Sequence, residues 1–533
     1  MKAKSLLLTV LTAVLFTGCS DSEGDSPDPS MIGRAFLSLS LQSSTGPSTR
    51  ADIVTEPGSA EESKAGDVKV LLFDKHDLCL GVVPVTGATI GNSSGVSNNN
   101  PPAEASDAIA VPAKTAKVFV VINPYTTGWE FTEDKVKNKT WDEINTTLID
   151  MKADNVATAD NFMMVSEGDK TTADKGALTD VTTNVKIPKD YTPEKVEDAK
   201  TAAKELPAVV NVDRLASKVT VTKATAFTIA PTDAKFTFQG WELSVTNKSV
   251  RLYSDLVSYD NKTTGAVYRK DKNYEVGEQP TTPTELRTAF DYLKNIDDTS
   301  EEIPEVTRAS EASAYCLENT MEAKAQKLGF TTKVVVKAQY TPKDITENTS
   351  YFSWNGKYYT LTTLKEEYNK DGSGLKTDLP IFLHKAKLME DGVFNGADQD
   401  EKNKVVEELT AEKFTAKTGI IGRYCAVRYY HESVCYYDVL IRHDKNVEQK
   451  MALGRWGVVR NNWYSISLQS VTGPGTPWIP DPSDPDPTDP DNPKPDPENP
   501  TGPDIDDDEN DAYLSVKITI NPWTFWTQEA NLH

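Results

Sequence analysis

Along most of the chain, apolar residues occur in short runs or alternate with polar ones, which is the pattern of β-strands. Runs of strand length lie at 68–73, 118–122, 162–165, 209–222, 236–245, 332–339, 423–430, 434–442 and 463–471. Gly, Asn and Pro residues suited to turns separate these runs. The spacing predicts an all-β fold built of β-sandwiches and argues against a wound α/β sheet.

Helix signals are few. A Thr-Pro pair opens a segment that predicts a helix over 193–205. A capping-box pattern, Thr282 with Glu285, opens a second predicted helix over 283–294. We therefore expect two sandwiches with few short helices, joined near residue 225.

The first twenty residues have the form of a lipoprotein signal. Lys2 and Lys4 precede an apolar stretch, 6–16, which has the length of a signal peptide and is too short to span a membrane. The sequence Phe-Thr-Gly-Cys that follows resembles a bacterial lipobox, so Cys19 is the expected site of lipidation with palmitate-type acyl chains. An ordinary secretory signal with an unmodified cysteine is the alternative.

Two segments at opposite ends of the chain share one pattern. Residues 35–41 (AFLSLSL), the leader strand, alternate apolar and polar positions as in a half-buried strand. Residues 512–518 (AYLSVKI) align with them without a gap and open the tail strand, 512–523. The aligned pairs are Ala35 with Ala512, Phe36 with Tyr513, Leu37 with Leu514, Ser38 with Ser515, Leu39 with Val516, Ser40 with Lys517 and Leu41 with Ile518.

The segment before the tail strand is an acidic, proline-rich spacer. Residues 473–503 contain twelve of the 31 prolines, and 481–511 contain eleven Asp, two Glu and one Lys. Such a tract cannot bury enough apolar area to fold, and its like charges keep it extended. The spacer holds the tail strand away from the body, although its length also lets the tail reach back to its own domain.

A strand with one apolar face needs a sheet edge or a groove to be stable. The leader strand precedes a small polar loop ending at Arg50, the kind of loop that proteases cut. A cut between Arg50 and Ala51 would vacate a groove filled by the leader strand, and the tail strand of another molecule would enter it by strand addition. This contact is head-to-tail and builds a filament unless it closes on itself. The alternative is that 512–523 folds back into its own domain.

Composition excludes several classes of function. The 533 residues include 57 Lys plus Arg and 80 Asp plus Glu, a net charge of −23, which disfavours nucleic-acid binding. Five scattered histidines and five cysteines make neither a metal site nor a disulfide scaffold. The Gly-x-Ser-x-Gly match at 91–95 is followed by a loop and lacks the context of a nucleophile elbow. We predict no enzyme activity, no catalytic residue, no metal and no cofactor.

Two of the cysteines, Cys425 and Cys435, flank a short run in what looks like a hairpin. They either face each other as a cross-strand disulfide or remain buried free thiols. Two arginines, Arg214 and Arg460, fall within predicted strands, where structural ion pairs are the expected role.

Several segments resemble the Bacteroidota fimbrillin family of major fimbrial subunits, with the strongest likeness to shaft subunits of the short (minor) fimbriae of Porphyromonas. The segments that carry the resemblance are 118–123 (VFVVIN), 162–164 (FMM), 212–219 (VDRLASKV), 459–466 (VRNNWYSI) and 514–523 (LSVKITINPW). No motif of this family is found over roughly 250–400.

The resemblance implies two transthyretin-like β-sandwich domains, export as an outer-membrane lipoprotein and removal of a propeptide by an arginine-specific protease. By position, that cut falls after Arg50, since a cut at Arg34 would spare the leader strand. It further implies strand exchange into an adhesive surface fimbria, a homopolymer with accessory anchor and tip subunits. The host or bacterial receptor is not implied.

These expectations divide the chain into 1–18 signal peptide, 19–50 propeptide with the leader strand, 51–224 N-terminal domain, 225–472 C-terminal domain, 473–511 spacer and 512–533 donor strand. The predicted site residues are Cys19 for lipidation, Arg50 and Ala51 for cleavage, Phe36, Leu37, Leu39 and Leu41 in the leader, and Tyr513, Leu514, Val516, Ile518, Ile520 and Trp523 in the tail. The competing hypothesis is a non-polymerising surface lipoprotein that binds glycans or a host protein through sandwich loops.

Overall fold

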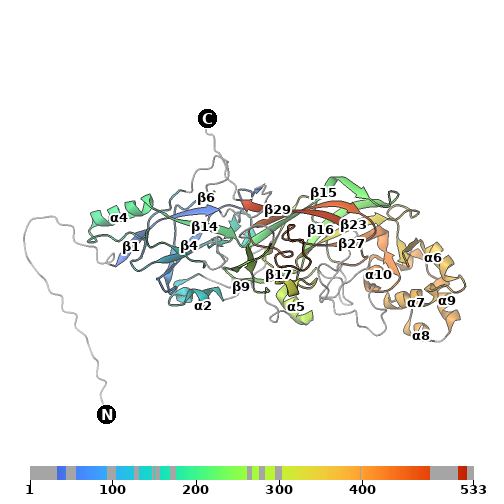
Figure 1. Ribbon diagram of the computed structural model, residues 1–533. Coiled ribbons are helices and arrows are strands. Elements are labelled where there is room, and N and C mark those ends of the chain that lie inside the picture. The colour runs from blue at the N-terminus through green and yellow to red at the C-terminus, as the bar shows by residue number, and fades with distance from the viewer. Residues whose placement is uncertain are drawn as a thin grey trace, which may run out of the picture.

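The computed structural model describes residues 33–43, 56–92, 104–124, 131–146, 149–150, 156–168, 176–260, 267–274, 283–293, 303–396, 398–479 and 514–524. In these parts the chain is mostly β-sheet, as the alternation predicts, and the molecule is elongated (Figure 1). Two β regions lie one after the other along the long axis, and a group of helices lies at one end (Figure 1).

The N-terminal β region is built on one large sheet with the order β5-β4-β8-β12-β14-β2-β6, to which β13 adds beside β8. A separate two-stranded sheet joins β1 and β7. The strands of this region are β1 (Arg34–Leu37), β2 (Leu39–Ser43), β4 (Val68–Phe73), β5 (Cys79–Pro84), β6 (Ile90–Asn92), β7 (Ile109–Pro112), β8 (Lys117–Ile122), β12 (Met164–Ser166), β13 (Thr179–Asp180) and β14 (Ala208–Arg214). Their apolar faces meet in one continuous core.

The second β region contains a sheet with the order β22-β15-β28-β29-β3 and a sheet with the order β16-β23-β27. Apolar side chains of both sheets form its core. Its strands are β3 (Glu56–Pro57), β15 (Ala216–Ile229), β16 (Lys235–Ser244), β22 (Ser313–Leu317), β23 (Lys333–Thr341), β27 (Val434–Leu440), β28 (Asn462–Val471) and β29 (Leu514–Thr524).

The chain passes from the first region to the second at a single buried residue, Leu215. The sequence pattern over 209–222 predicts one long strand, but in the structure Leu215 divides this segment into the end of β14 and the start of β15. No Gly or Pro marks this crossing, and the sequence places the joint about ten residues later, near 225.

A helical group interrupts the second β region between β23 and β27, and it was not predicted. Its members are β24 (Tyr351–Trp354), β25 (Lys357–Tyr359), α6 (Leu361–Tyr368), α7 (Leu375–Lys385), α8 (Asp391–Phe394), α9 (Gln399–Glu407), η2 (Ala411–Lys413), α10 (Ala416–Ile421) and β26 (Arg428–Tyr430). Aromatic and aliphatic side chains give this group a core of its own. Figure 1 shows it at the end of the molecule opposite α4.

The hairpin expected around Cys425 and Cys435 is wrong. β26 pairs with β24, whereas β27 pairs with β23, so the two strands belong to different sheets. The two cysteines lie in different apolar cores and are not joined in a disulfide. Burial raises the pKa of the Cys435 thiol to about 11, which keeps it protonated and unreactive.

The two helices expected from their start signals are present. α4 covers Pro193–Glu205, and α5 (Pro283–Ala289) ends earlier than predicted. The remaining elements are α1 (Glu133–Val136), α2 (Trp141–Asn145), β9 (Ile149–Asp150), β10 (Ala157–Thr158), β11 (Asn161–Phe162), β17 (Thr246–Asn247), β18 (Ser249–Val250), β19 (Asp255–Ser258), β20 (Val267–Lys270), β21 (Phe290–Asp291), η1 (Ala323–Ala325) and η3 (His431–Ser433).

Candidate functional site

The leader strand is inserted into the N-terminal region as two consecutive strands. β2 lies between β14 and β6 and runs parallel to both, with Leu39 opposite Ala208 and Leu41 opposite Ile90. β1 pairs antiparallel with β7, with Phe36 opposite Ala110. The leader therefore fills an interior position of the sheet, and its removal would uncover strand edges on both sides.

The leader is buried on both faces, so the expectation of a half-buried strand is wrong. Leu37, Leu39 and Leu41 are 0% exposed and belong to the main core. Phe36, on the opposite face, is 1% exposed because α4 covers it. Alternation in the sequence identifies the strand, but it cannot show that a helix 150 residues later covers the polar face.

The polar positions of the leader are buried with hydrogen-bond partners. The Ser38 hydroxyl donates to the Ser106 carbonyl at 2.6 Å, and the Leu39 backbone N–H donates to the Ser106 hydroxyl at 3.0 Å. A small side chain that both fits and hydrogen-bonds is required here, because an unpaired buried polar group is destabilising.

The tail strand lies in the C-terminal region of its own chain. β29 pairs antiparallel with β28 from Leu514 opposite Val471 to Pro522 opposite Asn462. Leu514 is 3% exposed and Val516 is half-buried against the second core. This is the fold-back arrangement that the sequence left open.

The remaining predicted tail residues are only partly described. Ile518, Ile520 and Trp523 lie on β29, opposite Ile466, Tyr464 and the short strand β3. Tyr513, Cys19, Arg50 and Ala51 lie outside the described residues.

The segment that follows the expected cleavage site contacts the end of the tail strand. β3 pairs parallel with β29, with Glu56 opposite Trp523 and Pro57 opposite Thr524. Glu56, the first described residue of this segment, is five positions after Ala51. Two segments near the ends of the proposed mature chain, β3 and β29, therefore lie on the same sheet.

Glu62 fixes this segment between the two β regions. Its carboxylate accepts hydrogen bonds from Lys218 Nζ at 2.8 Å, from the Tyr315 hydroxyl at 2.7 Å and from the Ser59 backbone N–H at 2.7 Å. Burial opposes ionisation of Glu62, but the bonds from Lys218 and Tyr315 outweigh it and lower the pKa of the carboxyl. An ionised Glu62 holds the segment around it against Lys218 of β15 and Tyr315 of β22.

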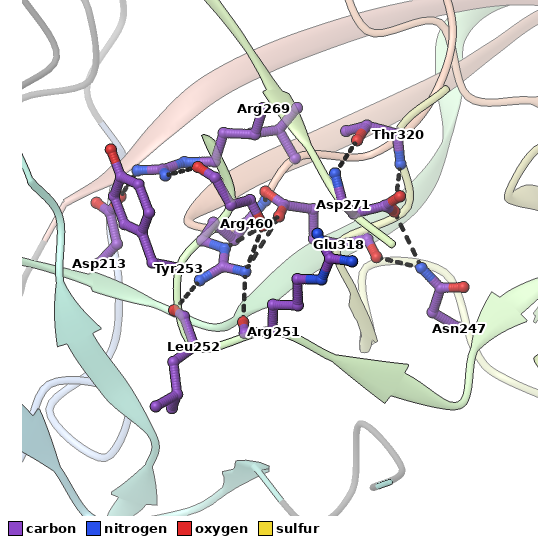
Figure 2. Close-up of polar contacts among 12 residues, drawn as sticks. Asp213, Asn247, Arg251, Leu252, Tyr253, Arg269, Asp271, Glu318, Thr320 and Arg460 are labelled. Carbon is purple, nitrogen blue, oxygen red and sulfur yellow. Dashed lines mark hydrogen bonds and ion pairs between the residues drawn. The ribbon is translucent and has the colours of Figure 1, made fainter. Parts of the chain in front are cut away.

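A buried polar network joins the regions beside this segment, and sequence reasoning missed it (Figure 2). Arg460 pairs with Glu318 at 3.1 Å and also donates to the Leu252 and Arg251 carbonyls at 2.7 and 3.0 Å. Arg269 pairs with Asp213 at 2.9 Å. The ion pair expected for Arg460 is confirmed, although the residue precedes β28 instead of lying in a strand.

The other arginine expected in an ion pair, Arg214, lies at the end of β14 and makes several buried hydrogen bonds. It donates to the Glu62 carbonyl at 2.8 Å, to the Ser63 hydroxyl at 3.0 Å and to the Asn461 side-chain carbonyl at 3.2 Å. Complete burial lowers the pKa of Arg214 to about 9.

Asp271 is the most strongly perturbed acid of this network (Figure 2). Burial, reinforced by the nearby Glu318 carboxylate, raises its pKa to about 7. Backbone N–H groups of Thr320 and Asn273, each 2.6 Å from a carboxylate oxygen, partly oppose this shift. Asp271 therefore titrates near neutral pH.

In the described parts of the chain, no group of three or more His, Cys, Asp or Glu side chains is placed to bind a metal ion. Within the same residues, no helix has both the length and the apolar character needed to cross a bilayer.

Two family models match the chain. Residues 35–204 match the major fimbrial subunit protein (FimA) model, and residues 428–529 match the model for the C-terminal part of type IV major fimbrial subunit protein, fimbrillin. The first match begins at the leader strand, and the second includes β28 and β29. No curated protein matches the sequence.

Solved structures with a distantly similar fold come from the Bacteroidales. A fimbrilin of Porphyromonas gingivalis W83 is 15% identical, with 92% of this chain and 98% of that chain covered and a TM-score of 0.36. The tip fimbrial protein Mfa3 of Porphyromonas gingivalis, truncated at its C-terminus, is 10% identical, with 92% and 100% covered and a TM-score of 0.33. A fimbrial assembly protein of Parabacteroides distasonis ATCC 8503 is 13% identical, with 58% and 98% covered and a TM-score of 0.24.

Proposed function

Because the chain belongs to the fimbrillin family of major fimbrial subunits, whose members are structural subunits of cell-surface fimbriae, we propose that it is a shaft subunit. It is exported as a lipoprotein acylated at Cys19 and cleaved between Arg50 and Ala51 by an arginine-specific protease. The tail strand of one subunit then enters the position that the leader strand leaves in the next. The product is an adhesive homopolymer with anchor and tip subunits at its ends.

The observation that carries this proposal is the interior position of the leader strand. β2 has a neighbour strand on each side, and both of its faces are covered. Burying an apolar side chain such as Leu39 contributes about 1.5–3 kcal/mol, so an emptied position is strongly unfavourable. A chain that loses its leader therefore needs another strand of the same pattern, and the tail strand has that pattern.

The two positions open to the tail strand differ in what they bury. On its own domain the tail pairs with β28 along its length, touches β3 only at its end, and leaves Ser515 and Lys517 exposed. The leader position offers strand pairing on both sides and cover from α4 on the outer face. Transfer of the tail into a vacated leader position exchanges an edge for an interior site, which favours assembly.

The glycan-binding alternative has no specific support in the described residues. Clustered exposed aromatic side chains would favour it, but Tyr358 is the one aromatic among the exposed large apolar side chains there.

The proposal is tested on the full chain cleaved after Arg50. Electrophoresis in SDS without boiling is expected to show a ladder of polymers, because strand-exchanged joints unfold slowly. A matched chain that ends at residue 511 keeps the same body and is expected to run as a monomer. A monomer band from the cleaved full chain under assembly conditions, or a ladder from the truncated chain, contradicts the proposal.

A further inference from the structure

Phe36 of the leader strand does not join the main core. Its ring packs in a separate small cluster against Val196, Ala199 and Ala203 of α4, with Ala108 and Ala110 at the rim. We call these five residues the α4 pocket. Four of them are alanines, and small side chains leave the space that an aromatic ring fills.

A cation lies over this ring. Lys200 Nζ is 5.6 Å from the centre of the Phe36 ring and is itself paired with Glu197 at 2.6 Å. An ammonium over the ring face favours an aromatic occupant over an aliphatic one. Lys200 and Glu197 can also form a hydrogen bond with the hydroxyl of a tyrosine in this position, because a phenolic hydroxyl needs a partner when the rest of the ring is buried.

In the part of the tail strand that aligns with the leader strand, residues 512–518, one aromatic residue lies on the matching face. In the gapless alignment Tyr513 takes the place of Phe36, and Ser515 takes the place of Ser38. Ser515 can therefore repeat the buried hydrogen bond that Ser38 makes to Ser106. The next residue on this face, Lys517, takes the place of Ser40 opposite Val209, which is 52% exposed and available to the aliphatic stem of the lysine.

We propose that the α4 pocket of one subunit binds Tyr513 of a second copy and thereby sets the register of strand exchange. This inference rests on the proposed function. A shift of one residue turns the apolar face of the tail strand outward. A shift of two places Ser515 or Asp511 in the α4 pocket, so the pocket is left unfilled or receives a carboxylate.

Disulfide trapping tests this register, using two chains that are each cleaved after Arg50 and keep the complete tail. One chain carries Ser106→Cys and the other Ser515→Cys, so that Tyr513 stays in place. Ser515 takes the position of Ser38, whose hydroxyl lies 3.5 Å from the Ser106 hydroxyl. The two chains are assembled together, oxidised and boiled in SDS without reductant. A cross-linked dimer is expected. The matched pair of Ser106→Cys with Thr519→Cys also keeps Tyr513, moves the second thiol four residues along the same face and is expected to give at least tenfold less dimer.

Assembly kinetics provide the second readout. Tyr513→Ser is expected to slow polymer formation at least tenfold, and Tyr513→Phe to restore it, since the ring is what fills the α4 pocket. Thr519→Ser, a small polar change further along the same face, is the control and leaves the rate unchanged.

The possible failures are distinguishable. If the parent chain forms no polymer at all, this outcome contradicts both the proposed function and the proposed register. If the parent chain assembles but the Thr519→Cys pair cross-links as well as the Ser515→Cys pair, or Tyr513→Ser assembles at the parental rate, the inference is overturned and the proposed function stands.

Discussion

The buried charges between the two β regions show how single residues hold this long molecule together. Arg460 and Glu318 are both nearly inaccessible to water, and each also has backbone or hydroxyl partners. A buried pair contributes little beyond what well-packed apolar residues would, but removing one member leaves an uncompensated charge. The network therefore penalises any arrangement in which the two regions separate.

Breaking this pair is predicted to be costly. Glu318→Gln leaves the Arg460 guanidinium buried without its counter-charge, and the free energy of unfolding should fall by about 3–5 kcal/mol. Glu242→Gln is the control, because its partner Arg308 lies 3.0 Å away in a half-exposed pair and the loss should be at most about 1 kcal/mol. Urea unfolding of the full chain measures the free energy of unfolding of both variants. Equal decreases in the two variants contradict this role of the Arg460–Glu318 pair.

Asp271 predicts a pH dependence of stability. Its pKa is raised from 3.8 to about 7 in the folded chain, so the folded state binds a proton that the unfolded state has released. Its contribution is fully present below pH 3.8 and is lost as the pH rises to about 7, with a slope of up to about 1.4 kcal/mol per pH unit.

Asp271→Asn removes this titration. The variant is less stable overall, because the amide nitrogen of asparagine cannot accept a hydrogen bond from a backbone N–H as the replaced carboxylate oxygen does. Its free energy of unfolding should nevertheless change less between pH 5 and 8 than that of the parent chain. Asp142→Asn, at an exposed position of α2, is the control and should keep the parental pH slope. Urea midpoints at several pH values provide the measurement, and parallel curves for parent and Asp271→Asn would rule out this role.

At the scale of elements, alternation predicts where strands form but not what covers them. The strands at 68–73 and 463–471 are found nearly as predicted, because β-branched residues between turn signals have few other options. The cover of the leader by α4 was not predictable, since it depends on a contact across more than 150 residues. The helical group over 361–421 was also missed, because its short helices carry weak start signals and are stabilised by a shared core.

The leader strand predicts a difference between precursor and mature chain. Leu39→Ala removes a fully buried side chain and should destabilise the uncleaved chain by about 2–5 kcal/mol. The same change should leave polymers of the cleaved chain unaffected, because the leader is no longer present. Gln42→Ala, at a half-buried position of the same strand, is the milder control. Thermal unfolding and assembly are measured in parallel, and slower assembly of cleaved Leu39→Ala chains would contradict a placeholder role.

At the scale of the whole molecule, the leader position lies in the N-terminal region and the tail strand in the C-terminal region of an elongated body (Figure 1). An exchange between such separated positions is a head-to-tail contact, which propagates into a filament unless its geometry closes it on itself. The matching patterns of the two strands were visible in the sequence. Their separate positions were not, because pattern alone does not assign a strand to a sheet.

The central claim is that a vacated leader position accepts the tail of another molecule. It is tested most directly by mixing two tagged chains that can each play one part: an acceptor cleaved after Arg50 and ending at residue 511, and a donor that keeps both its tail and, through Arg50→Ala, its leader. The account predicts an SDS-resistant dimer of one acceptor and one donor, and no such dimer when the acceptor is left uncleaved. A dimer that forms equally well with the uncleaved acceptor, or its absence with the cleaved one, contradicts the account.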